Sequence, residues 1–118
     1  MQSKKVIKLA ETALEDLKAN DIEVIDVRGK SSVTDYMIVC SGTSKRHVVS
    51  IASNVEDELK NHSINAISCE GQKSGDWVIV DLSDVVIHIL TVEARELYDL
   101  EKLWRFDMKP EQIIDASA

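Results

Sequence analysis

The chain has 118 residues, of which 44% are hydrophobic and 30% charged, and its formal net charge at pH 7 is −7. This balance is typical of one globular domain with a single core, and it excludes a disordered chain. No stretch approaches the ~18 uninterrupted apolar residues of a membrane-spanning helix, so we expect no membrane partner. An acidic surface repels a phosphate backbone, which argues against a nucleic-acid binder, whether generic or sequence-specific.

The acidic excess has two interpretations. Acidic side chains either keep a small domain soluble or attract a basic partner by complementary charge.

The two cysteines, Cys40 and Cys69, could form at most one bridge, and nothing in the sequence indicates an oxidising compartment. We therefore expect reduced thiols and a cytoplasmic location.

The first half of the chain predicts a helix, two strands and a second helix. Apolar residues recur at helical spacing over residues 4–19. Alternation predicts a strand over 22–27, and β-branched and aromatic residues predict another over 33–40. Residues 41–44, Ser-Gly-Thr-Ser, are expected to break this strand and to cap a helix that closes near 61–63.

The second half of the chain completes an α/β pattern. It predicts three strands and a final helix, over residues 66–70, 77–82, 85–90 and 93–104. The order of elements indicates a mixed sheet of about five strands with helices packed on it. Residues 1–104 then form a single domain. The segment 105–118, with Pro110 and weak periodicity, is expected to be a partly disordered tail.

The last two strands are separated by Ser83 and Asp84 alone, which predicts a tight hairpin with Leu82 opposite Val85. Opposed residues share a face of the sheet, so the register sorts the hairpin into two faces. One face is wholly aliphatic and must pack against helices: Val78, Val80, Leu82, Val85, Ile87 and Ile89. The other face is apolar but carries a carboxylate and an imidazole: Trp77, Ile79, Asp81, Val86, His88 and Leu90.

This second face has two interpretations. It forms a second core layer under the final helix, with Asp81 and His88 satisfied by hydrogen bonds, or it forms an exposed apolar patch that binds a protein. In the second case Trp77 is the natural anchor, because a desolvated indole offers a large contact area. We expect three residues of the final helix to border the patch: Tyr98, Glu101 and Trp104.

The segment that carries Gly42, Thr43, Ser44, Lys45 and Arg46 offers a candidate anion site. A strand–glycine–hydroxyl–helix turn directs backbone N–H groups and a helix dipole toward an anion, and two cations would reinforce it. Capping of the helix also accounts for the hydroxyls, with the cations facing solvent. A bound phosphate and a simple cap therefore both remain open.

Metal and catalytic motifs are missing from the sequence. The three histidines and two cysteines lack the spacing of metal ligands, so we expect no metal. No nucleophile elbow or Walker-type phosphate loop is present, so we expect no catalytic residue and no cofactor.

Several motifs closely resemble the Iojap or ribosomal silencing factor family, in order over about residues 3–104. Ser83 stands where members commonly have glycine, which affects only the geometry of that turn. The motifs are DVRGKSSVTDYM at 26–37, GTSKRH at 42–47, DWVIVD at 76–81, DVVIHI at 84–89 and YDLEKLW at 98–104.

The resemblance implies a nucleotidyltransferase-like fold without the catalytic apparatus. Residues 66–70 indeed lack the paired Asp-x-Asp that a nucleotidyltransferase carries on the strand after its Gly-Ser turn. The resemblance also implies binding to the large ribosomal subunit through large-subunit protein fourteen (uL14), which blocks subunit joining and represses translation. A homodimer off the ribosome is a further expectation. The alternative is a nucleotide-binding or nucleotidyl-transferring enzyme that uses the turn at Gly42.

Overall fold

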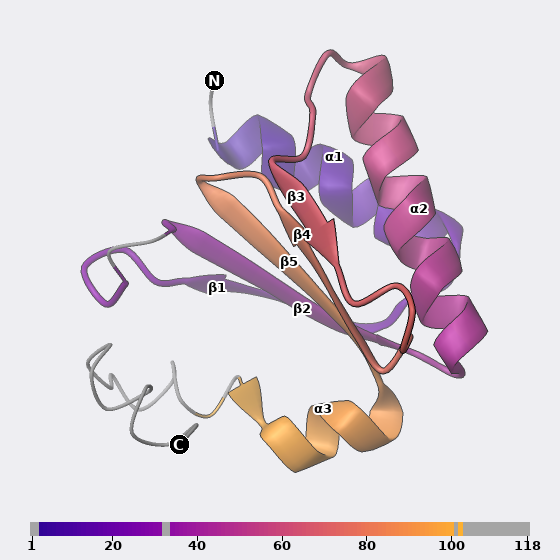
Figure 1. Ribbon diagram of the computed structural model, residues 1–118. Coiled ribbons are helices and arrows are strands. Elements are labelled where there is room, and N and C mark those ends of the chain that lie inside the picture. The colour runs from indigo at the N-terminus through magenta and orange to yellow at the C-terminus, as the bar shows by residue number, and fades with distance from the viewer. Residues whose placement is uncertain (1–2, 32–33, 101, 103–118) are drawn as a thin grey trace.

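The computed structural model describes residues 3–31, 34–100 and 102, and it shows a five-stranded mixed sheet between helices (Figure 1). The elements follow the predicted order, which confirms the α/β class. They are α1 (Ser3–Asp16), β1 (Asn20–Asp26), β2 (Tyr36–Gly42), α2 (Lys45–Asn61), β3 (Ser68–Glu70), β4 (Trp77–Asp81), β5 (Val85–Thr91) and α3 (Val92–Tyr98).

The strands lie in the order β1-β2-β5-β4-β3. β2 and β5 run parallel at the centre, and every other neighbouring pair is antiparallel. The predicted hairpin register is confirmed, because Asp81 pairs with Val86 and Ile79 pairs with His88. The two-residue loop fixes this register, and with it the face of the sheet on which each side chain lies.

Helices α1 and α2 together cover one face of the sheet, as Figure 1 shows. The larger core cluster lies between these helices and the sheet, and it contains the aliphatic face of the hairpin. Leu14, Ile51 and Ile87 are fully buried in it. Each such side chain contributes about 1.5–3 kcal/mol by leaving water, so this layer supplies most of the apolar burial.

Helix α3 lies on the opposite face, where it packs mainly on β2 and β5 (Figure 1). The core cluster on this side is much smaller. Its buried members are Val27, Met37, Val39, Leu90 and Ala94, with Ile25, Trp77 and Leu100 packed at its edge.

Strand β2 differs from its predicted range of 33–40. It begins at Tyr36, where pairing with Val85 of β5 begins, and it continues through Ser41 to Gly42. The prediction that Ser41 and Gly42 break the strand is wrong, because Ser41 pairs with both neighbouring strands. Partners that are distant in sequence therefore override the local turn signal.

Helix α3 ends within the predicted range of 93–104, and the backbone is helical again at Leu100 and Lys102. The helix ends at Tyr98, because Asp99 takes a left-handed conformation with φ 46° and ψ 52°, and its N–H donates to the carbonyl of Arg95. Aspartate tolerates this conformation better than most residues. The chain then turns so that Leu100 packs on the smaller core cluster. The expected tail at 105–118 lies outside the described residues.

Candidate functional site

The hairpin places five of the predicted partner-binding residues on the face that α3 partly covers. β4 and β5 are neighbouring antiparallel strands, so side chains from opposed positions lie next to one another. All five side chains are half-buried. They are Trp77, Ile79, Asp81, Val86 and His88, and we call them the hairpin patch.

Trp77 and His88 are joined by a hydrogen bond within this patch. The indole Nε1–H donates to Nδ1 of His88 over 3.0 Å, and the ring centroids lie 5.8 Å apart. Burial lowers the pKa of His88 to about 4. The imidazole is therefore neutral near pH 7, and its unprotonated Nδ1 is available as an acceptor.

Tyr98 extends the aromatic surface from β4 onto α3. Its ring centroid lies 4.8 Å from that of Trp77, at an interplanar angle of 41°. Tyr98 is 50% exposed and its neighbour Leu97 is 76% exposed, so the outer side of α3 presents apolar surface to solvent. The other two predicted border residues, Glu101 and Trp104, lie outside the described residues.

Each interpretation of the second face fits a different part of it. Beneath α3, Leu90 is fully buried and forms a core layer with Ala94. Beyond α3, Ile79 and Val86 stay half-buried, and the Oδ1 atom of Asp81 accepts the N–H of Ser83 over 2.8 Å. The face is therefore part core and part accessible apolar surface.

The turn at 42–46 is well ordered by its own contacts. Ser44 is the N-cap of α2, and its Oγ accepts the N–H of His47 over 3.0 Å. The N–H of Thr43 donates to Nδ1 of His47 over 2.9 Å. Nζ of Lys45 lies 3.7 Å from Oδ1 of Asp76. The N–H of Thr43 is thus satisfied within the chain and requires no bound anion.

His47 is the residue of this turn whose importance the sequence did not indicate. Its Nδ1 accepts from Thr43, so Nε2 carries the proton and donates to the carbonyl oxygen of Leu17 over 2.7 Å. The imidazole therefore ties the β2–α2 turn to the end of α1. Its spacing from Ser44 and Thr43 was visible in the sequence, but its contact with Leu17 depends on the tertiary fold.

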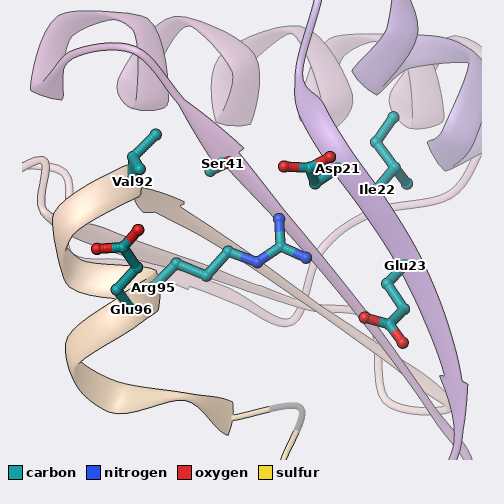
Figure 2. Close-up of a pocket in the computed structure, with 7 residues that line it drawn as sticks. All are labelled: Asp21, Ile22, Glu23, Ser41, Val92, Arg95 and Glu96. Carbon is teal, nitrogen blue, oxygen red and sulfur yellow. The ribbon is translucent and has the colours of Figure 1, made fainter.

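Two grooves flank α3. One, of about 510 Å³, is shown in Figure 2, where Arg95 reaches from α3 across β2 toward β1. Nη1 of Arg95 donates to the carbonyl oxygen of Asn20 over 3.3 Å, which joins α3 to the edge strand. The other groove, of about 500 Å³, is lined by Lys45 and Asp76 and by Leu97 and Tyr98 of α3. It therefore links the turn to the aromatic surface.

The described part of the chain contains neither a cluster of metal-ligand side chains nor a helix that could span a membrane. Residues 3–31, 34–100 and 102 contain no group of three or more His, Cys, Asp or Glu side chains placed to hold a metal ion. Cys40 and Cys69 are free thiols, and burial raises the pKa of each to about 12. Among the described helices, none has the length and apolar character needed to cross a bilayer.

Comparison with known proteins assigns the family. The family model described as "Ribosomal silencing factor during starvation" matches residues 1–117. The chain belongs to this family. The ribosomal silencing factor of Haemophilus influenzae is 49% identical over 91 residues, covering 77% of this chain and 89% of the relative. That of Bacillus subtilis is 39% identical over 104 residues, or 88% of each chain.

A solved structure supports the same assignment. The crystal structure of a Chromobacterium violaceum protein superposes with a TM-score of 0.86 at 40% sequence identity, over 88% of this chain and 87% of that one. The resemblance to the ribosomal silencing factors is thus confirmed in sequence and in fold. The general role of the family is regulation of translation at the ribosome.

Proposed function

We propose that this silencing factor binds the large ribosomal subunit through protein fourteen, blocks association with the small subunit and thereby represses translation. The observation that carries the proposal is the aromatic pair of a half-buried Trp77 and a 50% exposed Tyr98 on the partly covered face of a family member. A bound protein at a subunit interface excludes the other subunit sterically. No catalytic residue, metal or cofactor is therefore required, and we propose a non-enzymatic, cytoplasmic repressor.

The proposed interface is the hairpin patch together with Tyr98, Glu101 and Trp104. Aromatic and aliphatic groups form the desolvated centre of an interface, while charges lie at its rim. Asp81, at the end of β4, supplies a carboxylate to the hairpin patch. The whole chain carries a net charge of −7. A basic ribosomal protein fits both properties.

Off the ribosome, we propose that the same apolar surface supports a homodimer. An apolar surface that is free of its partner favours self-association. Binding to the ribosome would then compete with the dimer.

Co-sedimentation with purified ribosomal subunits tests the proposed partner. The wild-type protein is expected to sediment with large subunits and to stay unbound with small ones. Trp77→Ala is expected to weaken binding by about 2 kcal/mol, roughly 30-fold, as loss of an interface hot spot does. Val24→Ala removes an apolar side chain that is 38% exposed on β1, outside the proposed interface, and serves as the control. Failure of the wild-type protein to sediment with large subunits at saturation would contradict the proposal.

A further inference from the structure

We propose that His88 is a positioning residue: its hydrogen bond holds the Trp77 indole in the orientation that the ribosomal partner meets. This inference rests on the proposed function, because it assigns Trp77 to the interface. The contribution of His88 to binding is assigned to its hydrogen bond with the indole. The orientation of the indole ring can be measured in the absence of the partner.

The strand register brings the two residues together. Ile79 pairs with His88 and Trp77 pairs with Leu90, so Trp77 and His88 are diagonal neighbours on the same face. Diagonal positions on neighbouring antiparallel strands are within reach of long aromatic side chains. The hydrogen bond of 3.0 Å therefore forms between two side chains whose backbones the hairpin already fixes.

The indole is held from two sides. Its single polar atom is engaged by His88 of β5, and Tyr98 of α3 lies 4.8 Å from the ring centroid. Because the N–H points to His88, the indole offers carbon atoms and π-surface to a partner. An indole already fixed in its bound orientation loses little side-chain entropy on binding, which strengthens the complex.

The surroundings of His88 keep it an acceptor. Its neighbours across the sheet are Val39 on β2 and Ile79 on β4, both apolar. No described carboxylate forms an ion pair with the imidazole. The neutral ring therefore presents an unprotonated Nδ1 to the indole N–H.

Two substitutions at His88 separate the hydrogen bond from packing. His88→Leu keeps a similar volume and removes the acceptor. His88→Asn is the matched control, because its Oδ1 is attached to Cγ as Nδ1 is in histidine, and it can accept from Trp77. Thermal melts of each variant show that it folds. The indole Nε1–H resonance of Trp77, assigned with Trp77→Phe, reports the bond in a ¹⁵N–¹H spectrum.

His88→Leu is expected to shift this resonance, to speed its exchange with solvent and to weaken binding to large subunits about 3- to 10-fold, the range for one hydrogen bond. His88→Asn is expected to restore both properties. In the Trp77→Phe background, which has no N–H to position, His88→Leu is expected to have no further effect on binding. This non-additivity distinguishes positioning from a structural role.

Three results would overturn the inference: an unchanged indole resonance in His88→Leu, normal binding by that variant, or additive effects of the two substitutions. Absence of binding by the wild-type protein would contradict the proposed function and the binding role of His88 with it. In that case the resonance would still decide whether His88 orients the indole.

Discussion

Nε2 of His47 donates to the carbonyl oxygen of Leu17 over 2.7 Å, and Nδ1 of the same ring accepts the N–H of Thr43. One imidazole therefore connects two segments that are 30 residues apart in the sequence. The bond holds the end of α1 to the start of α2 at the edge of the larger core cluster, against which Leu17 packs. The turn at 42–46 is consequently part of the scaffold.

Replacing His47 tests this connection. His47→Ala removes both hydrogen bonds and is expected to lower the free energy of unfolding by about 1–3 kcal/mol, as the loss of two such bonds does. His62→Ala is the matched control, because His62 is exposed at the end of α2. Urea denaturation measures both. Equal stability of the two variants would show that the His47 bridge contributes nothing.

The N-cap of α2 is expected to contribute more to the stability of the fold than the two cations that follow it. Ser44→Ala removes the N-cap of α2 and is expected to cost about 1 kcal/mol. Lys45→Ala breaks only an exposed pair with Asp76, and Arg46→Ala removes a cation that opposes the helix dipole, so each is expected to change stability by less than about 0.5 kcal/mol. Destabilisation by either cation variant that equals the effect of Ser44→Ala would refute this ranking.

The backbone next to Trp77 requires a glycine at position 71. Gly71 has φ +97°, and a Cβ there would collide with the carbonyl oxygen of Trp77. Gly71→Ala is therefore expected to destabilise the protein by at least about 2 kcal/mol. Gly29, with φ +81°, is the matched control, since a Cβ there meets no described atom within 4 Å and only the conformational cost of about 1 kcal/mol applies. Thermal melts of Gly71→Ala and Gly29→Ala compare the two, and a smaller effect at Gly71 would contradict the geometry.

Protonation of His88 is expected to reduce stability in mild acid. Burial lowers its pKa in the folded protein from 6.5 to about 4. The unfolded chain binds the proton below pH 6.5, whereas the folded chain binds it only near pH 4, so stability falls as the pH drops through this window. The expected loss between pH 7.5 and 4.5 is about 2.5 kcal/mol.

In His88→Asn, the side chain at position 88 does not titrate, while every other titratable group of the protein is kept. The difference in unfolding free energy between wild type and His88→Asn, followed by urea denaturation across the same pH range, isolates the contribution of His88. A difference that is independent of pH would show that the imidazole is not desolvated.

Features set by local chemistry could be predicted from the sequence. The two-residue loop at Ser83 and Asp84 gave the correct hairpin register, and aliphatic alternation gave the buried face of β4 and β5. Ser44 was among the predicted caps, and it is the N-cap of α2. In each case a few neighbouring residues contain all the information that the structure uses.

Features set by distant partners could not be predicted. β2 extends through Ser41 because Asn20 and Leu90 pair with it, and α3 stops at Tyr98 because Asp99 turns left-handed and directs Leu100 to the core. The division of the second face into core and accessible surface depends on how far α3 extends over the sheet. Sequence periodicity gives no measure of that coverage.

A subunit-joining assay measures directly whether this protein keeps ribosomal subunits apart, as we propose. Purified large and small subunits are mixed with increasing amounts of protein, and joined ribosomes are separated on a sucrose gradient. The wild-type protein is expected to lower the yield of joined ribosomes in proportion to its occupancy of large subunits. Trp77→Ala is expected to need roughly 30-fold more protein for the same effect, as for a hot spot worth about 2 kcal/mol, and Val24→Ala to act as wild type. An unchanged yield of joined ribosomes at saturating wild-type protein would contradict the account.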